Sequence, residues 1–217
     1  MSLNVIFDMD GLMFDSERLY AKAWEFAGSK AGISVSDIVK KTSGISFEES
    51  KKIWNSEIGD KVDIESFYND FIDFIKDRYE NDSPIPKKGL CDLLNYLKDE
   101  NANIAVASNA NMKLIEHNLK SANIYDYFKV IVSVEMVENP KPDPEIYIKA
   151  SDLLGVSPQD AYALEDSRAG ITAAYKAGCK SILIPDLWNP DEEILSHILA
   201  KYDDLEQVKN DFELKKI

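Results

Sequence analysis

The sequence is poor in cysteine and lacks any long hydrophobic run, and both absences narrow the classes of protein that it can encode. Its two cysteines, Cys91 and Cys179, do not have metal-ligand spacing, and we expect both to be small core side chains in a reducing compartment. No stretch approaches the roughly 18 apolar residues of a transmembrane helix. The start of the chain has no basic region followed by an apolar stretch, so we expect a cytoplasmic protein.

Positive charge is also scarce, because 25 lysines and arginines stand against 39 aspartates and glutamates, which gives a formal net charge of −14. A chain this acidic is a poor candidate for binding nucleic acid or anionic membranes. Its length of 217 residues suits one large domain or two small ones with a substantial core. We therefore expect a folded enzyme that holds a cation locally. The sequence does not specify an oligomeric state, and a monomer is compatible with it.

Short apolar runs alternate with amphipathic helical segments over most of the chain. The runs expected to form strands are 3–7, 104–107, 161–164 and 181–184, with a weaker fifth run at 130–134. The helices expected after them are 111–121, 143–154 and 167–177. Gly178 is the expected C-cap of the last of these, and the stretch after Pro190 is expected to be helical. This alternation predicts an α/β fold with a doubly wound parallel sheet.

Residues 15–83 break the alternation, because they show helical periodicity and no convincing strand. Asp15 is expected to cap a helix that runs to about residue 31, where Gly32 ends it. Further helices are expected at 36–41, 47–58 and 64–80. We interpret residues 15–83 as a helical cap domain inserted after the first strand, with residues 1–14 and 84–217 as the core domain.

Two aspartates, Asp8 and Asp10, follow the first apolar run, and Gly11 comes next. A buried strand that ends on two carboxylates brings like charges together, which is costly unless a cation or a shared proton relieves them. Mg²⁺ does so with oxygen ligands alone, and glycine lets the chain turn away tightly. Taken alone, solvated acids at a strand end explain this short motif equally well.

The other expected strands also lead into polar residues, and ligands of open α/β sheets bind at the carboxyl ends of the strands. These residues are Ser108, Asn109, Lys141, Glu165 and Asp166. Four carboxylates can hold a cation, while a lysine and a hydroxyl can hold an anion, so Mg²⁺ with a phosphate is the economical interpretation. The alternatives are a helix cap for Ser108, a solvated loop position for Lys141 and helix-dipole partners for the acidic pair. Together these alternatives would require four coincidences at corresponding strand ends.

By these residues the chain resembles the haloacid dehalogenase superfamily, in the branch of β-phosphoglucomutases and small-molecule phosphatases with a helical cap. The four motifs are Phe7-Asp8-Met9-Asp10-Gly11, Ser108-Asn109, Lys141-Pro142 and Glu165-Asp166-Ser167. The resemblance spans about residues 4–185 and is weak in the cap beyond Gly44 and Ser50. It implies a phosphorylated small-molecule substrate, Mg²⁺ as the cofactor, and a cis peptide bond between Lys141 and Pro142.

The resemblance also implies the roles of the reacting residues. Asp8 would be the nucleophile that forms an aspartyl phosphate, which requires its carboxyl to be ionised. Asp10 would be the general acid that protonates the leaving alkoxide and then the base that activates water. Lys141 would neutralise the negative charges that meet at phosphorus. The helical cap would close over the site, exclude water and recognise the leaving group.

The remaining motif residues would bind the phosphoryl group and the metal. By the resemblance, Ser108 and the backbone of Asn109 and Ala110 would hold the phosphoryl oxygens. The implied Mg²⁺ ligands are Asp8, Asp10 through its carbonyl, Asp166, and Glu165 either directly or through water.

The chain departs from the mutase pattern at two places in the expected cap. Tyr20 stands where these mutases carry a histidine, and Phe47 stands where they carry an arginine that grips the second phosphate. Lys51 and Lys52 are near that position but not aligned with it. We therefore favour a phosphatase, with a β-phosphoglucomutase-type mutase as the alternative. Tyr20, Phe47 and Trp54 are candidates for an aromatic cap lining, although Trp54 fits a role in the cap core better.

Two other classes fit less well. A signalling receiver domain also uses a strand-end aspartate, nearby acids, a lysine and Mg²⁺, but it lacks an acid at the Asp10 position and a helical insertion like that of residues 15–83. A dehalogenase needs no Mg²⁺ and has no use for Asp10 with Glu165 and Asp166. The sequence does not name the substrate, because specificity would reside in the cap.

Overall fold

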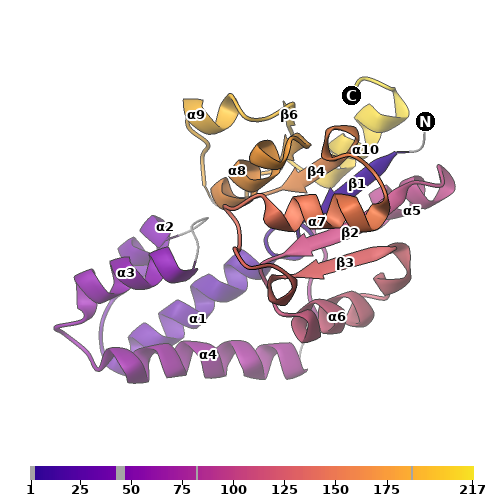
Figure 1. Ribbon diagram of the computed structural model, residues 1–217. Coiled ribbons are helices and arrows are strands. Elements are labelled where there is room, and N and C mark those ends of the chain that lie inside the picture. The colour runs from indigo at the N-terminus through magenta and orange to yellow at the C-terminus, as the bar shows by residue number, and fades with distance from the viewer. Residues whose placement is uncertain (1–2, 43–46, 82, 187) are drawn as a thin grey trace.

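Six parallel strands form the central sheet in the part of the chain that the structure describes, in the order β3-β2-β1-β4-β5-β6 (Figure 1). The structure is a computed structural model that describes residues 3–42, 47–81, 83–186 and 188–217. The strands are β1 (Asn4–Phe7), β2 (Asn103–Ser108), β3 (Val130–Ser133), β4 (Tyr162–Glu165), β5 (Lys180–Leu183) and β6 (Ala200–Lys201). The predicted α/β fold and its five strands are confirmed. The two-residue β6 was not predicted, because so short a strand gives no periodicity.

The helices agree with the sequence in type and closely in bounds. They are α1 (Ser16–Ala31), α2 (Ser36–Thr42), α3 (Phe47–Ile58), α4 (Ile64–Asn81), α5 (Leu90–Asp99), α6 (Met112–Ser121), α7 (Glu145–Leu154), α8 (Arg168–Ala177), α9 (Glu192–Leu195) and α10 (Leu205–Glu213), with 3₁₀ turns at Tyr125–Tyr127, Val134–Met136 and Pro158–Asp160. Gly32 and Gly178 end α1 and α8 in the left-handed conformation, as expected. Helix α5 was not predicted. In the described part of the chain, no helix combines the length and the apolar character needed to cross a membrane.

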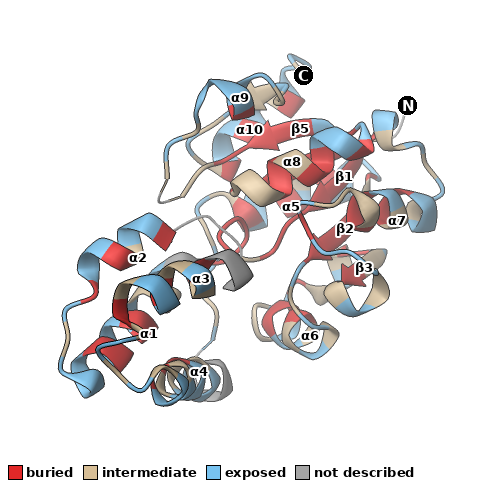
Figure 2. Ribbon diagram, turned by 60° about the vertical axis from the view of Figure 1, so that its left-hand side comes forward, coloured by how far each residue is buried: buried red, intermediate tan, exposed pale blue. Residues whose placement is uncertain are grey.

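The strands of the sheet are largely buried (Figure 2). Their alternate residues belong to two separate hydrophobic layers, as the two-residue period of a strand requires. Phe7 on β1 packs in the layer that α5, α6 and α10 cover. Its neighbour Ile6 packs in the opposite layer, under α7 and α8. Both residues are fully buried, which explains why β1 reads as a continuous apolar run.

The register of the sheet aligns the ends of its central strands. Phe7 pairs with Val106 on β2 and with Leu164 on β4, so Asp8 lies at the level of Ala107 and Glu165, one residue before Ser108 and Asp166. A single edge of the sheet therefore collects the polar residues that come after the apolar runs.

Helices α1 to α4 pack around an aromatic cluster of their own. Trp24 stacks on Trp54 with ring centroids 4.5 Å apart and on Phe71 at 3.7 Å, and Phe67 completes the group. Trp54 is fully buried there, as a cap-core residue should be. In Figure 1 these helices lie to one side of the sheet and are joined to it at the start of α1 and the end of α4.

Two sequence expectations about individual residues are wrong. Asp15 precedes α1 but makes no capping bond, because its carboxylate pairs with Arg18 at 2.7 Å instead. Cys91 was expected in the core, yet it is exposed on α5, whose buried positions are taken by leucines. Cys179, the other thiol, is buried as expected.

Candidate active site

The end of β1 delivers Asp8 to the carboxyl edge of the sheet. The Asp8 backbone N–H donates to the Leu164 carbonyl at 3.0 Å, so the pairing with β4 continues one residue past the strand. Gly11 follows with a φ of 83°, and a Cβ at this position would lie 2.0 Å from Asp166 Oδ2. Glycine alone permits both this turn and the close approach of the carboxylate. The tight turn therefore brings Asp166 against the loop that carries Asp8.

Lys141 is a buried cation between two of the carboxylates. Its Nζ donates to Asp8 Oδ1 at 2.6 Å, to Glu165 Oε1 at 2.6 Å and to the Ala107 carbonyl at 2.8 Å. These acceptors satisfy all three donors of the ammonium group. The Lys141 side chain is only 3% exposed, so the alternative of a solvated loop lysine is wrong. The Lys141–Pro142 peptide bond is cis, as expected.

The loop after β2 supports Lys141 and presents a hydroxyl. Asn109 binds the Lys141 backbone on both sides, accepting from its N–H at 3.1 Å and donating to its carbonyl at 3.4 Å. Ser108 is buried, and its Oγ accepts from the Ala110 N–H at 3.0 Å. The cap of α6 is Asn111, whose side chain accepts from Leu114 N–H, so Ser108 is not the helix cap.

Glu165 at the end of β4 is fully buried and bonded through both oxygens. Its Oε1 accepts from Lys141 and also from the Tyr147 hydroxyl at 2.5 Å, while Oε2 accepts from the Ser167 hydroxyl at 3.2 Å. A Cβ on Gly170 would lie 1.8 Å from Glu165 Cδ, so the start of α8 has room for this carboxylate only because residue 170 is glycine. Glu165 is thus held rigidly as the second partner of Lys141.

Three buried carboxylates converge on one point of this edge. Oxygens of Asp8, Glu165 and Asp166 all lie within 4.8 Å of one another. One buried ammonium, that of Lys141, accompanies these three negative charges, so the group retains an excess of negative charge that a divalent cation would offset. The oxygen-only donor set is the kind that Mg²⁺ prefers. The carboxylates therefore fit a Mg²⁺ site. Trp188 restrains it further by donating its indole N–H to the Asp166 carbonyl at 2.5 Å.

Burial governs the ionisation of these groups. It raises the pKa of Asp8 well above its usual value, with Lys141 opposing the shift and Glu165 adding to it. Burial alone would lower the pKa of Lys141, but the charges of Asp8 and Glu165 outweigh it and raise that pKa. The raised pKa of Asp8 favours its neutral form, whereas the raised pKa of Lys141 favours the ion pair. The 2.6 Å contacts of the Lys141 ammonium with Asp8 and Glu165 fit a protonated lysine between carboxylates.

Asp10 has a different environment from Asp8, although the two lie two residues apart. The pKa of Asp10 is raised from 3.8 to about 6, because burial raises it by more than the hydrogen bond from Ser16, the charge of Lys141 and the hydrogen bond from Tyr20 lower it. The Tyr20 hydroxyl lies 3.5 Å from Asp10 Oδ1. A carboxyl with this pKa changes its protonation near neutral pH, as an acid and base must.

Helix α1 reaches the site through two side chains. Ser16 Oγ accepts from the Gly11 N–H at 2.8 Å, and Tyr20 approaches Asp10. Tyr20 therefore lies beside Asp10, where a residue that lines the site is expected. The side chain of Phe47, and the whole of residues 43–46 with Gly44, lie outside the described residues.

Four contacts in this site were not found from the sequence. Tyr147 carried a usable signal, because a hydroxyl on the buried face of a predicted helix requires a hydrogen-bond partner. No sequence signal identified the contacts of the Asn109 side chain, Ser16 and Trp188, because their partners lie far along the chain or are backbone groups. The structure brings the residues predicted at the strand ends, including Asp8, Lys141 and Asp166, together at one edge of the sheet.

Comparisons with known proteins agree with this geometry. A family described as haloacid dehalogenase-like hydrolase matches residues 5–184. The phosphorylated carbohydrates phosphatase of Thermotoga maritima is 30% identical over 179 residues, which cover 82% of each chain. The β-phosphoglucomutase of Bacillus subtilis is 33% identical over 186 residues, covering 80% of this chain and 79% of that protein. The crystal structure of β-phosphoglucomutase from Clostridium difficile superimposes with a TM-score of 0.73 at 27% identity, covering 100% of this chain and 97% of that one.

The raised pKa of Asp10 predicts a pH-dependent cost to stability. Below pH 3.8 Asp10 is protonated in both states, between pH 3.8 and 6 it ionises only in the unfolded chain, and above about 6 the full cost of the buried charge is present. Asp10→Asn should therefore stabilise the fold by roughly 1–3 kcal/mol at pH 8 and hardly at all at pH 4. Urea unfolding in EDTA at both pH values measures this, with Asp160→Asn as an exposed control. Equal effects at the two pH values would contradict it.

Proposed function

Because the chain belongs to the haloacid dehalogenase-like hydrolase family, in its β-phosphoglucomutase-like branch, we propose that it is a Mg²⁺-dependent phosphatase of small phosphomonoesters such as sugar phosphates. It is an enzyme of the phosphoric monoester hydrolase class. The observation that carries the proposal is the 2.6 Å contact between Lys141 Nζ and Asp8 Oδ1, two residues before a carboxyl with a pKa of about 6. This arrangement supplies an ionised nucleophile and, beside it, a separate proton donor.

The first step transfers the phosphoryl group to the protein. A carboxylate oxygen of Asp8 attacks phosphorus in line, a P–O bond to Asp8 forms, and the bond to the leaving oxygen breaks. Asp10 gives its proton to that oxygen, so the product leaves as an alcohol. Lys141 stays beside Asp8 and offsets the negative charge that gathers as a carboxylate meets a phosphate.

The second step transfers the phosphoryl group from Asp8 to water. Asp10, now ionised, accepts a proton from the attacking water, and the P–O bond to Asp8 breaks to release phosphate. Both carboxyls then regain their starting states. Tyr20 lies close enough to Asp10 to orient it in both steps.

The transferring group would be held at the end of β2. Ser108, with the backbone of Asn109 and Ala110, would contact the phosphoryl oxygens, since they adjoin Lys141 at the same edge. In the described state the Ala110 N–H donates to Ser108 Oγ, so binding a phosphate would redirect these groups. The Asn109 side chain remains bonded to Lys141 and keeps that cation in place.

The metal would be held by Asp8, the Asp10 carbonyl and Asp166, with Glu165 adding negative charge. Glu165 is the least available ligand of the four, because its oxygens already accept from Lys141, Tyr147 and Ser167. A bound Mg²⁺ would supply positive charge that keeps Asp8 ionised and offsets the charge of the substrate phosphate.

This ligand assignment predicts that Asp166→Asn weakens Mg²⁺ binding by about tenfold or more, because one anionic oxygen ligand becomes a neutral amide. Isothermal titration calorimetry with MgCl₂ measures the affinity without reference to turnover. Asp160→Asn makes the same charge change on an exposed residue ahead of β4 and should bind as the wild type does. Unchanged affinity in Asp166→Asn would rule out the assignment.

We propose that residues 15–83 form the cap that moves against the core of residues 1–14 and 84–217. The two connections run side by side, with the Asp15 N–H donating to the Ile85 carbonyl at 3.0 Å and the Lys87 N–H to the Met13 carbonyl at 2.9 Å. A hinge at this point would leave both hydrophobic cores intact, because the aromatic cluster of the cap shares no residue with the layers at the sheet.

Hydrolysis is favoured over intramolecular transfer because residues 43–50 of the proposed cap offer no cationic anchor for a second phosphate. A mutase must hold a bisphosphate whose second phosphate needs a cationic anchor, and a charge-assisted contact of that kind contributes about 1.5–3 kcal/mol. The sequence from Ser43 to Ser50 contains no lysine or arginine but two glutamates. Lys51 Nζ lies 5.8 Å from the centroid of the Tyr68 ring, within the cap itself. Water should therefore outcompete a sugar hydroxyl at the aspartyl phosphate.

The covalent mechanism predicts that Asp8→Asn lowers turnover by about 1,000-fold or more while the fold is retained. Phosphate release from a panel of sugar, polyol and nucleotide phosphates, assayed with Mg²⁺ and with EDTA, provides the measurement. Asp10→Asn is the informative comparison, because it should still form phosphoenzyme from substrates with good leaving groups but hydrolyse it slowly. Substantial turnover in a clean Asp8→Asn preparation would refute Asp8 as the nucleophile.

The preference for hydrolysis predicts free phosphate as the main product even from a mutase substrate. The enzyme is incubated with β-glucose 1-phosphate and a catalytic amount of β-glucose 1,6-bisphosphate, and phosphate and glucose 6-phosphate are followed together. Phosphate should exceed glucose 6-phosphate at all times. Rapid formation of glucose 6-phosphate with negligible phosphate would establish the mutase alternative instead.

A further inference from the structure

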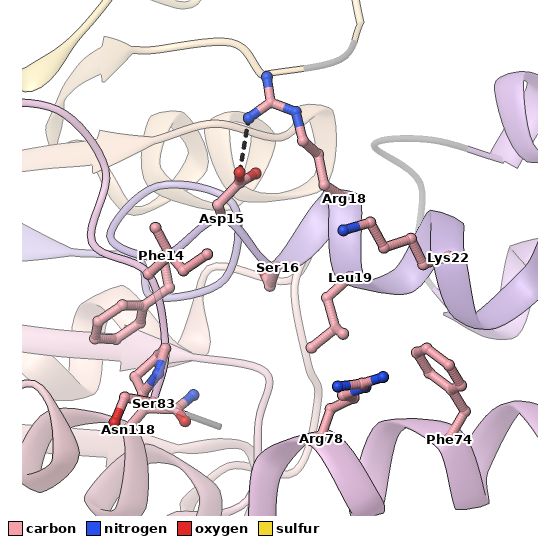
Figure 3. A pocket seen from close by; sticks show the side chains of 12 residues that line it. Phe14, Asp15, Ser16, Arg18, Leu19, Lys22, Phe74, Arg78, Ser83 and Asn118 are labelled. Carbon is pink, nitrogen blue, oxygen red and sulfur yellow. Dashed lines mark hydrogen bonds and ion pairs between the residues drawn. The ribbon is translucent and has the colours of Figure 1, made fainter. Parts of the chain in front are cut away.

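A cavity of about 300 Å³ lies beside the two connections between the helical bundle and the sheet (Figure 3). Helices α1 and α4, both connecting segments and one residue of α6 line it. None of the residues assigned above to phosphoryl transfer or metal binding lines it. We call it the hinge pocket, and its volume is at the lower end of those that bind small ligands.

The walls of the hinge pocket are largely apolar. Phe14, Leu19 and Phe74 line it, with Pro84 and Ile85 from the second connection. Figure 3 shows Leu19 and Phe74 on two different helices, with Phe14 to the left of Leu19 in this view. Such a lining favours a ring or a short hydrocarbon body over a fully hydrated ion.

Three cations border these apolar walls, although the chain as a whole carries a net charge of −14. Lys22 forms no ion pair with any described residue, and Arg78 lies over the Phe74 ring at 5.4 Å from its centroid. Arg18 pairs with Asp15, which is the one carboxylate among the twelve lining residues. The local excess of positive charge in an acidic protein selects for an anionic group.

Asn118 on α6 adds a polar group at the inner end of the pocket. It is 1% exposed, and its Nδ2 donates to Met9 Sδ at 3.7 Å. Its Oδ1 is buried and has no hydrogen-bond partner among the described residues. A buried carbonyl oxygen without a donor is costly, so a ligand that brings an O–H or N–H to this point gains that contact.

We propose that the hinge pocket binds a small organic anion that has an apolar body, with its charged group at Lys22 and Arg78 and a hydrogen-bond donor at Asn118. Because the pocket is lined by both connections, by cap helices and by α6 of the core, an occupant would restrain the cap against the core. Turnover that requires the cap to open and close would then slow, without competition for the active site.

The test uses 6-hydroxynaphthalene-2-sulfonate, which has the required anion, rings and hydroxyl and cannot be hydrolysed as a phosphoester. Its affinity for the whole protein is measured by isothermal titration calorimetry, beside 2,6-dihydroxynaphthalene as the uncharged analogue. We expect the sulfonate to bind at least about tenfold more tightly than the diol. The Lys22→Gln/Arg78→Gln double variant should remove this difference, whereas Lys40→Gln on α2, an exposed lysine outside the pocket, should retain it.

Four results would overturn the proposal. Absence of binding, or equal binding by the double variant, would exclude the pocket as the site. If inorganic phosphate displaces the sulfonate at concentrations that fill the active site, the sulfonate binds in the active site instead. The sulfonate should also lower kcat in the wild type and not in the double variant. Binding of the sulfonate with no change in kcat would contradict the proposal that an occupant restrains the cap against the core.

Discussion

The ion pairs of Lys141 with Asp8 and Glu165 are the constraint on which the rest of the site depends. An isolated ammonium or carboxylate so far from water would be too costly to keep charged, so each member requires the others. Lys141 makes three contacts of 2.6 to 2.8 Å, and Glu165 takes two further hydrogen bonds, from Tyr147 and Ser167. The result is a fixed positive charge beside a buried carboxylate, set by the core rather than by a mobile loop.

The parallel sheet makes this arrangement possible by bringing together residues that are 133 positions apart. Because Phe7 on β1 pairs with Leu164 on β4, Asp8 and Glu165 lie at the same level at the carboxyl ends of these strands. Glycine then provides space where a side chain would collide, at Gly11 against Asp166 and at Gly170 against Glu165. The carboxylates can approach closely enough to shift one another's pKa because the backbone carries no Cβ at these two positions.

The sequence predicted the elements with strong periodicity and the residues at their ends. The apolar run before Asp8 and the helix before Gly178 follow from local patterns, and both are confirmed. The missed contacts join residues that are far apart in the chain: the Tyr147 hydroxyl donates to Glu165 across 18 residues, and Asn109 binds the Lys141 backbone across 32. Cys91 was misplaced because an apolar neighbourhood does not say which side of a helix faces solvent. The ligands of the site were therefore readable, whereas the groups that orient them required the fold.

The helical bundle touches the site through α1, and this contact distinguishes the surroundings of Asp10 from those of Asp8. Ser16 holds the Gly11 N–H, and Tyr20 approaches Asp10, so any rotation of α1 changes the environment of Asp10. Among the described residues Asp8 makes no hydrogen bond to α1, and its pKa is set by burial together with the charges of Lys141, Glu165 and Asp10. Asp8 is thus held by a cation at the end of the sheet, whereas Asp10 also has a contact with the helical bundle. In the proposed mechanism, a movement of α1 would therefore act first on Asp10, the proposed acid and base, and would leave the direct contact between Asp8 and Lys141 in place.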